Sequence, residues 1–394
     1  MNPGFEHLQP YPFERLSQLL GQVQAPSHLT PIPLSIGEPR HAPFQAALDA
    51  HLTAFTESAG KYPSIRGSDS LREACSHWVS RRFGVALDPE RMLHPVNGTR
   101  EGLFAIAQAL IDPADRAVVA MPNPFYQIYE GAALMAGAEP VYLNAPESHG
   151  YLPDLSQLTP EILARMRVFY LCSPVNPAGS VASLEYLKEL WHLAVENDFV
   201  LVVDECYIDI YRDQPPHSIL NAAEPDFRNT LAFHSLSKRS NLPGLRSGFV
   251  AGDAELIRQF AQYRTYHGCS LPVASQIAST VAWSDDDHVA ANRDAYNEKF
   301  AAAQSILANE LNVTTPDAAF YLWPKIPGDD TAFCRALFEQ THVTAVPGQY
   351  FGRDVHGINP GAGRIRLSLV AELEQTTQAL QRIADFCRHY PACP

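Results

Sequence analysis

The stretch His234-Ser-Leu-Ser-Lys238-Arg-Ser-Asn-Leu-Pro-Gly-Leu-Arg246-Ser-Gly248 starts where an apolar run of strand length ends. A lysine among small polar residues at a strand end can be an imine-forming amine, because partial burial and neighbouring cations lower its pKa. Ser235, Ser237 and Arg246 could hold a dianionic phosphate through charge-assisted hydrogen bonds. The alternative is a solvent-exposed loop that carries two incidental basic residues.

Three more polar segments lie upstream of this stretch. Asp204 ends the apolar run Leu201-Val-Val-Asp204. A carboxylate there needs a partner such as a protonated ring nitrogen, unless it is simply a helix N-cap. Asn176, in Ser173-Pro-Val-Asn176-Pro-Ala-Gly179, could place its amide on a phenolic oxygen or belong to an ordinary Pro/Gly turn. Asn97-Gly98-Thr99 opens a helical pattern whose backbone N–H groups favour an anion, with a plain N-cap as the alternative.

Apolar runs of strand length recur through the middle of the chain and alternate with helical patterns. The runs are Ala117–Met121, Glu139–Leu143, Val168–Cys172, Phe199–Asp204, Thr230–His234 and Gly248–Ala251. The clearest helices are Thr99–Leu110 and Ser183–Asn197, and both should pack on the sheet. The alternation predicts an α/β fold, with a mostly parallel sheet covered by helices on both faces, in a large domain at residues 50–285.

The two ends of the chain predict a second, smaller α/β domain, formed by residues 1–49 and 286–394. The Pro-rich segment Pro26–Pro43 is too extended to form a domain alone and should pack on this unit. After residue 286 the pattern becomes a long helix, two short strand-like runs and a closing helix, at His288–Glu310, Ala319–Trp323, Gly363–Leu369 and Ala371–His389.

Composition excludes several classes of protein. The 394 residues include 29 Lys and Arg against 43 Asp and Glu, and the formal net charge of −14 argues against nucleic-acid binding. The 7 cysteines are scattered, which suits free thiols in a reducing compartment. The amino terminus lacks signal-peptide features, and the polar content and Pro272 of Thr265–Ser284 favour buried helices over a membrane span. We therefore expect a cytoplasmic protein. The absence of nucleotide-binding and zinc motifs predicts no metal site.

In their order along the chain, the motifs resemble the fold-type I pyridoxal-phosphate enzymes, and more narrowly the class I/II aminotransferases. The resemblance covers nearly the whole chain, and although each motif is weak alone, the ordered set is specific. The matching motifs are Ile36-Gly37-Glu38-Pro39, Tyr62-Pro-Ser-Ile-Arg-Gly67, Asn97-Gly-Thr99, Pro122-Asn-Pro-Phe-Tyr126, Asn176-Pro-Ala-Gly179, Asp204-Glu-Cys-Tyr207, Ser235-Leu-Ser-Lys238, Arg246-Ser-Gly248 and Arg364-Ile-Arg366.

The resemblance implies a pyridoxal 5′-phosphate cofactor and assigns it contacts. Lys238 would bind the cofactor as an imine and pass the proton between the substrate α-carbon and the cofactor C4′. Asp204 would keep the pyridine nitrogen protonated, which makes the ring an electron sink. Tyr62 would reach the phosphate from the partner subunit of a homodimer with shared active sites. The other contacts would be Tyr207 and Asn176 to the ring oxygen, Tyr126 on the ring face, and Gly98, Thr99, Ser235, Ser237 and Arg246 to the phosphate. From sequence alone, an aromatic residue such as Tyr126 after a strand is more often part of the core.

Arg366 is the expected contact for the substrate α-carboxylate. The alternation in Arg364-Ile-Arg366-Leu-Ser is typical of a strand and places both arginines on one face, although an exposed edge strand is the alternative. A planar carboxylate suits the forked guanidinium of arginine. Gly37 would let the backbone approach the same carboxylate, and Asn176 is expected at the substrate as well.

Within the class, the segments 97–104 and 235–253 look most like the bacterial N-succinyldiaminopimelate aminotransferases of lysine and diaminopimelate biosynthesis. That resemblance implies transfer of the amino group of glutamate to the ketone of N-succinyl-2-amino-6-oxopimelate. Arg40 is a candidate for a distal carboxylate of this polyanionic substrate, or a plain surface arginine. An aminotransferase for aspartate, kynurenine or LL-diaminopimelate, or a pyridoxal-dependent lyase, would share the cofactor residues. A non-catalytic ligand-binding regulator would usually lack the lysine.

Overall fold

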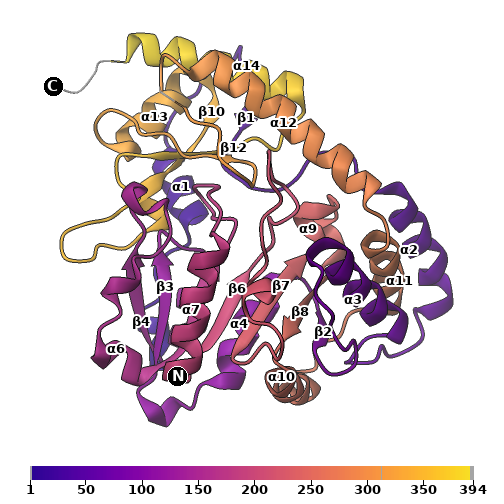
Figure 1. Ribbon diagram of the computed structural model, residues 1–394. Helices are drawn as coiled ribbons and strands as arrows, with labels where there is room; N and C mark the ends of the chain where they lie inside the picture. The colour runs from indigo at the N-terminus through magenta and orange to yellow at the C-terminus, as the bar shows by residue number, and fades with distance from the viewer. Residues whose placement is uncertain (1, 312, 391–394) are drawn as a thin grey trace.

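A seven-stranded sheet forms the centre of the computed structural model, which describes residues 2–311 and 313–390 (Figure 1). Its strand order is β2-β8-β7-β6-β5-β3-β4. Neighbouring strands are parallel except where β8 meets β7 and β2. The strands are β2 (Leu93–Val96), β3 (Val118–Asn123), β4 (Glu139–Asn144), β5 (Met166–Cys172), β6 (Val200–Asp204), β7 (Thr230–Ser235) and β8 (Gly248–Gly252).

Helices cover both faces of this sheet, because successive residues of a strand point to opposite sides. Leu201 and Val203 of β6 lie in one core, and Val202 lies in the other. On the first face pack α3 (Asp69–Phe83), α7 (Leu184–Asn197), α8 (Ile219–Ala222) and α11 (Val273–Trp283). On the second face pack α4 (Thr99–Leu110), α5 (Ile128–Met135) and α10 (Ala254–His267). This double burial explains why the central strands are continuously apolar.

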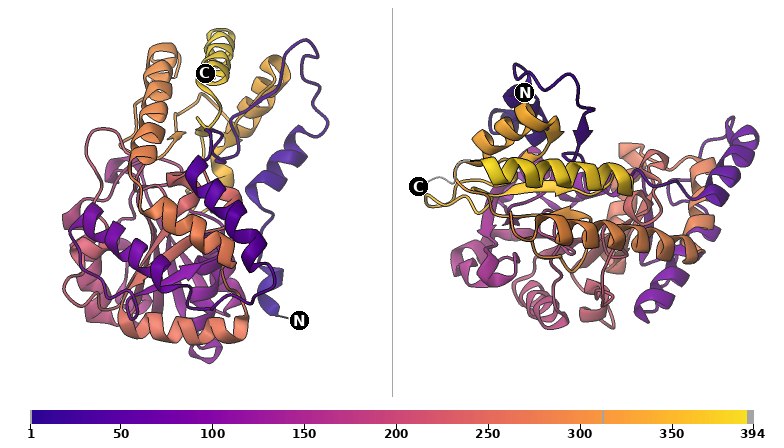
Figure 2. Two further views of the ribbon diagram at one scale, coloured as in Figure 1. Left: turned by 90° about the vertical axis from the view of Figure 1, so that its right-hand side faces the viewer. Right: turned by 90° about the horizontal axis from the view of Figure 1, so that it is seen from above.

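A second layer lies across one edge of the sheet, at the top of Figure 1. It contains the three-stranded sheet β11-β12-β9 and the pair β1-β10. Figure 2 shows its two long helices, α12 (Asp287–Leu307) and α14 (Leu373–His389), side by side. The other elements are α1 (Pro12–Leu20), α13 (Asp330–Thr341), β1 (Ile32–Pro33), β9 (Tyr321–Leu322), β10 (Val343–Thr344), β11 (Val346–Pro347) and β12 (Ile365–Ser368). The predicted packing of the Pro-rich segment on this layer is confirmed, since Ile32 pairs with Val343.

The six predicted strands are confirmed within two residues at each end, and Ser183 is the N-cap of α7 as its pattern indicates. Strand β2 was not among the predicted strands; its sequence Leu93-His-Pro-Val contains a proline, which is tolerated at the sheet edge that β2 occupies. Strands β2 to β8 all lie within residues 50–285. Helix α2 (Gln45–Ser58) runs through the first proposed boundary, so the division into domains remains a proposal.

The sequence predicts free cysteine thiols and no membrane-spanning segment. Among residues 2–311 and 313–390, the six cysteines are free thiols; Cys393 lies outside the described residues. In the same ranges no helix combines the length and the apolar character needed to cross a bilayer. The stretch Thr265–Ser284 holds the end of α10 and all of α11, which packs against α2 and α3.

Candidate active site

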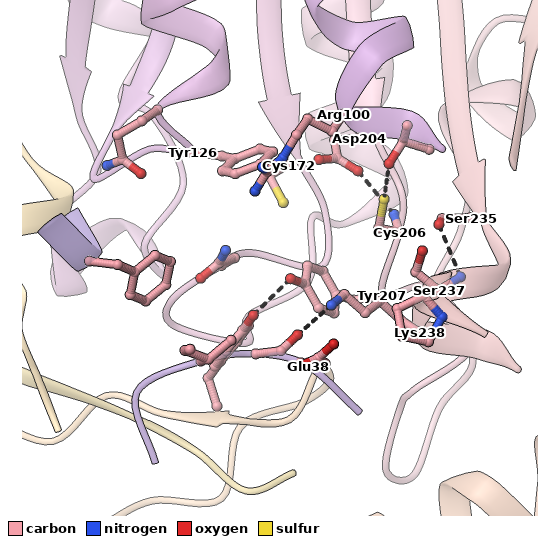
Figure 3. Close-up of a pocket in the computed structure, with 18 of the residues that line it drawn as sticks. Glu38, Arg100, Tyr126, Cys172, Asp204, Cys206, Tyr207, Ser235, Ser237 and Lys238 are labelled. Carbon is pink, nitrogen blue, oxygen red and sulfur yellow. Dashed lines mark hydrogen bonds between the residues drawn. The ribbon is translucent and has the colours of Figure 1, made fainter. Parts of the chain in front are cut away.

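A cavity of about 510 Å³ lies where β3, β5, β6 and β7 end, between the large sheet and the second layer. Parallel strands bring the loops at their carboxyl ends to one edge, where α/β proteins bind ligands. Residues from these loops and from the second layer therefore meet here (Figure 3). The cavity is lined by most of the predicted site residues: Gly37, Thr99, Tyr126, Asn176, Asp204, Tyr207, Ser235, Ser237, Lys238, Arg246 and Arg366.

Lys238 lies on α9 (Leu236–Arg239), the single helical turn that follows β7. Its Nζ donates a hydrogen bond to the carbonyl of Gly37. Burial is the largest cause that lowers the pKa of Lys238, to about 8, and Arg366 lowers it further, whereas Cys206 raises it. A substantial fraction of this amine is therefore neutral near pH 8, which a nucleophilic lysine requires.

Asp204 ends β6, is 4% exposed and points into the same space as Lys238 (Figure 3). Its Oδ2 accepts from the Tyr129 hydroxyl at 3.0 Å, and its Oδ1 accepts from the backbone N–H of Cys206 at 3.2 Å. Burial raises its pKa, and these hydrogen bonds oppose that shift. A buried carboxylate held by neutral donors is suited to a cationic partner in the cavity.

The start of α4 and the segment around Arg246 form an anion cradle. Gly98 has φ of +81°, and a Cβ there would lie 2.3 Å from a terminal nitrogen of Arg246, so only glycine permits this approach. Within the described chain no side chain caps α4 at Gly98, which leaves backbone N–H groups for an anion. Thr99 contacts Cys206 at 2.9 Å between Oγ1 and Sγ, and the Ser235 hydroxyl accepts from the N–H of Ser237 at 3.1 Å.

Arg366 is 3% exposed, on the middle strand of the three-stranded sheet. Its Nη1 donates to Asn176 Oδ1 at 3.0 Å and its Nη2 to the carbonyl of Ser35 at 2.7 Å. In the part of the chain that the structure describes, its buried Nε has no hydrogen-bond partner. The rings of Tyr321 and Phe351 lie 4.6 and 4.4 Å from its guanidinium carbon. The alternative of an exposed edge strand is wrong, because β12 is a middle strand and Arg366 is buried among aromatic rings, with N–H capacity left over.

Three predicted residues do not line the cavity of this chain. Gly98 lies outside the cavity lining, where its backbone packs against the side chain of Arg246. Tyr62 is 103% exposed, on the loop after α2. Arg40 is also exposed and absent from the cavity lining of the described residues, so its proposed contact with a distal carboxylate has no support within one chain.

Sequence reasoning missed several cavity residues. The Tyr321 hydroxyl lies 2.8 Å from that of Tyr207, and Arg100 Nε donates to the Tyr126 hydroxyl at 2.7 Å. Phe13, from α1, also lies beside Arg366. The strand-like run at residues 319–323 was recognised, but no local signal distinguishes a tyrosine that faces a site from one in the core.

Comparison with known proteins places the chain in a family. The model of the aminotransferases of class I and II matches residues 30–383. The chain belongs to this family. An LL-diaminopimelate aminotransferase from Dehalococcoides mccartyi is 30% identical over 393 residues, which cover 98% of each chain.

Solved aminotransferase structures share the fold. An aminotransferase from Neisseria meningitidis is 41% identical, with a TM-score of 0.94, covering 98% of this chain and 100% of that one. A protein from Thermus thermophilus described as a probable N-succinyldiaminopimelate aminotransferase is 27% identical, with a TM-score of 0.86, covering 95% and 99%. The expectation of an α/β fold-type I aminotransferase is confirmed.

Aminotransferases of this class depend on pyridoxal 5′-phosphate, and the cavity has the chemistry to hold it. Asp204 offers a buried carboxylate to a ring cation, and Lys238 offers an amine of lowered pKa. The anion cradle brings the guanidinium of Arg246 to the start of α4, where a phosphate would be stabilised. These three features are independent, and all of them fit this cofactor.

Proposed function

We propose that this aminotransferase transfers the amino group of glutamate to N-succinyl-2-amino-6-oxopimelate, using Lys238 as its reactive amine. Amino-group transfer is supported by one observation above all: Lys238, Asp204 and Arg366 line one cavity although they come from three separate elements. They supply an amine, a partner for a ring cation and a partner for a carboxylate. An α-amino acid presents its amine and its carboxylate one carbon apart, as this arrangement requires.

Bound pyridoxal 5′-phosphate would supply an electron-withdrawing ring that stabilises negative charge at the substrate α-carbon. Lys238 would hold the cofactor and then, as a free amine, take the proton from the substrate α-carbon and return it at the cofactor C4′. Asp204 would hold the ring nitrogen in its charged form. Tyr207 and Asn176 would donate to the ring oxygen, and Tyr126 would cover the ring face. Thr99, Ser235, Ser237 and Arg246 would bind the phosphate, with Gly98 giving Arg246 room.

Arg366 is suited to the α-carboxylate. Two of its five N–H groups are used by Asn176 and Ser35, and the remaining ones can form a bidentate pair. The flanking rings of Tyr321 and Phe351 would fix the plane of the guanidinium and keep water from the ion pair. A Cβ at position 37 would lie 2.3 Å from the Tyr321 hydroxyl, so Gly37 keeps the chain close to this subsite.

The pimelate skeleton carries a second, distal carboxylate, and Arg100 is placed for it better than Arg40. Arg100 lines the cavity, and its guanidinium donates to the neutral hydroxyls of Tyr126 and Tyr11. Within the described residues it forms no ion pair with a carboxylate, so its charge is available to a ligand. Arg40 could contribute only from outside this cavity.

LL-diaminopimelate is the second candidate substrate, because relatives named LL-diaminopimelate aminotransferase match nearly the full length of the chain. LL-diaminopimelate and the amino acid that the proposed reaction forms, N-succinyl-LL-2,6-diaminopimelate, carry the same α-carboxylate and the same distal carboxylate and differ only in the succinyl group. Amino transfer from glutamate would be compared with the succinylated ketone, the unsuccinylated one, oxaloacetate and pyruvate as acceptors. A preference of at least tenfold in kcat/KM for the succinylated ketone is expected. A preference for any other acceptor would show that the succinylated ketone is not the substrate.

The cofactor is tested separately from the acceptor. The purified protein should absorb in the visible range and lose that absorbance when glutamate is added, as the amino group moves to the cofactor. A colourless protein that takes up no added pyridoxal 5′-phosphate would refute the whole proposal.

The exposed Tyr62 supports a homodimer in which this residue reaches the partner's cavity. Leu52 and Phe55 of α2 are exposed on the preceding helix, as expected for a surface that a second copy covers. Inactive Lys238→Ala chains would be mixed with inactive Tyr62→Ala chains. Shared sites predict that hybrid dimers regain part of the activity, since one of their two sites carries neither change. No recovery after demonstrated subunit exchange would mean that each site is built within one chain.

A further inference from the structure

Asn292, on α12, is a buried junction behind Lys238. It is 5% exposed, and its Nδ2 donates to the carbonyls of Lys238 at 3.1 Å and Arg239 at 3.2 Å. Its Oδ1 lies 2.7 Å from His41 Nδ1 and accepts from Asn241 Nδ2 at 3.0 Å. The side-chain amide thus uses its full hydrogen-bonding capacity, and its two donors hold the carbonyls of the reactive lysine and of the residue that follows it.

These contacts fix the direction of each hydrogen bond. Because Asn292 Oδ1 can only accept, His41 Nδ1 must carry the proton and donate. Burial lowers the pKa of His41, so the ring is neutral and its Nε2 is an acceptor. The ammonium of Lys299 contacts that Nε2 and must be its donor. Every donor therefore points from Lys299, through His41 and Asn292, to the carbonyl groups of Lys238 and Arg239.

Lys299 is an unusual residue for a core position. It is 1% exposed, and in the described ranges of the chain its side chain bonds to a histidine and to no carboxylate. Burial lowers the pKa of Lys299 to about 8, although the nearby carboxylate of Glu372 attracts the ammonium and opposes this shift. A buried ammonium that forms no direct salt bridge costs stability unless its hydrogen bonds are organised. An apolar side chain would fill the same space at less cost, which indicates that the charge has a use beyond packing.

The segment that carries His41 also contacts the other end of Lys238. The Gly37 carbonyl accepts from Lys238 Nζ, while His41 reaches the main chain of the same lysine through Asn292. His41 is further held by the ring of Tyr296, at 4.5 Å between centroids. The tip and the base of Lys238 are thus tied to one five-residue segment.

We propose that Asn292, His41 and Lys299 form a positioning network that fixes the main chain of Lys238 relative to the segment 37–41 while the lysine side chain moves. The inference rests on the proposed role of Lys238. A lysine that binds the cofactor, leaves it and then moves a proton must swing from a fixed base, and misplacement by about 1 Å can cost about 100-fold in rate. None of the three residues touches the reacting atoms, so each acts through Lys238.

The first test uses the holoenzyme of Asn292→Asp, which keeps the shape and the acceptor but loses both donors to the Lys238 turn. Neighbouring His41 and Lys299 can stabilise the new carboxylate, so folding should survive. We expect kcat with glutamate to fall about 10- to 100-fold with KM within threefold. The pH midpoint of the absorbance of the lysine-bound cofactor should rise, because an anion now lies near Lys238. Asn221→Asp is the matched control, since Asn221 Nδ2 donates to the Phe83 carbonyl at 2.9 Å, outside the cavity.

The second test measures coupling. His41→Phe keeps a ring against Tyr296 but has no nitrogen, and Lys299→Met keeps length without charge. Each should lower kcat several-fold, and the double variant should be no worse than the more impaired single one, because both changes break one chain of hydrogen bonds. If the losses of kcat in His41→Phe and Lys299→Met add up in the double variant, the proposed network is wrong. It is also wrong if the Asn292→Asp holoenzyme keeps kcat within twofold of wild type and shows no change in the pH midpoint of its absorbance. A wild-type protein without cofactor absorbance would instead refute the proposed function.

Discussion

Arg364 and Arg366 stand two positions apart in sequence, yet they line different cavities. Arg366 enters the 510 Å³ cavity, where its two bonded nitrogens meet neutral oxygens and its Nε is left over. Arg364 lines a second cavity of about 330 Å³ and pairs with Glu147 Oε2 at 2.9 Å. Glu147 is also 2.6 Å from the amine of Lys325. A buried guanidinium whose charge is not matched by protein carboxylates marks the ligand site, whereas a matched one holds the fold together.

The same distinction applies to the lysines. Lys238 faces the first cavity with a pKa near 8, while Lys325 is paired at the mouth of the second. Both cavities therefore carry basic side chains, but among the described residues those of the second, Lys325 and Arg364, are paired with Glu147. Four experiments test this contrast between the two cavities.

The largest effect is expected from Lys238→Ala. Turnover should fall at least 10²–10⁴-fold, the usual worth of a positioned proton-transfer group. Cofactor binding should weaken but persist, because the phosphate cradle and Asp204 do not depend on the amine. Steady-state rates and equilibrium dialysis with pyridoxal 5′-phosphate measure the two effects. Lys325→Ala is the control and should leave both near wild type; a Lys238→Ala enzyme of near wild-type rate would show that another group is the reactive amine.

Next in size is Arg366→Lys compared with Arg364→Lys. Loss of one arm of a charge-assisted pair is worth about 1.5–3 kcal/mol, so kcat/KM should fall about 10- to 100-fold for glutamate and for the oxo acid alike. Arg364→Lys should leave kcat/KM within threefold and instead lower the melting temperature. Equal kinetic losses for both variants would mean that the charge contrast between the cavities does not decide binding.

A smaller and more selective effect is expected from Arg100→Ala. The succinylated ketone carries the distal carboxylate that Arg100 is proposed to bind, so its kcat/KM should fall about tenfold, while pyruvate, which lacks that group, should change less than threefold. Arg40→Ala serves as the control with the same change of charge outside the cavity. A larger selective loss in Arg40→Ala would restore Arg40 as the distal contact, supplied across a subunit interface.

The mildest test is pH. Only the neutral amine of Lys238 can bond to the cofactor, so the rate at which the cofactor-free protein takes up pyridoxal 5′-phosphate should rise with pH and level off above about 8. An ordinary lysine would continue to gain up to a pH near 10.4. In Arg366→Met, which removes a cation that lowers this pKa, the midpoint should move upward. An unchanged midpoint would mean that burial alone sets the pKa.

Most of the proposed cofactor site could be predicted from the sequence, because each part belongs to the end or the start of a single element. Asp204 follows an apolar run, Gly98-Thr99 opens a helix and Ser235 to Lys238 follow a strand, so the parallel sheet brings them to one edge. The proposed substrate half was harder to predict. Arg366 was found by motif, but Tyr321, Phe351 and Arg100, which line the same cavity, have no local signature.

The order and the type of the elements follow from local sequence, since apolar periodicity, glycines and caps act over a few residues. Which charges are matched depends on contacts between segments that are distant along the chain. Arg366 bonds to Ser35, 331 positions away, and Arg364 to Glu147, 217 positions away. The alternation that places the two arginines on one face of a strand carries no information about those distant partners. Burial, pKa and free hydrogen-bonding capacity depend on what the folded chain brings alongside, so the role of each arginine was set by packing between segments remote in sequence.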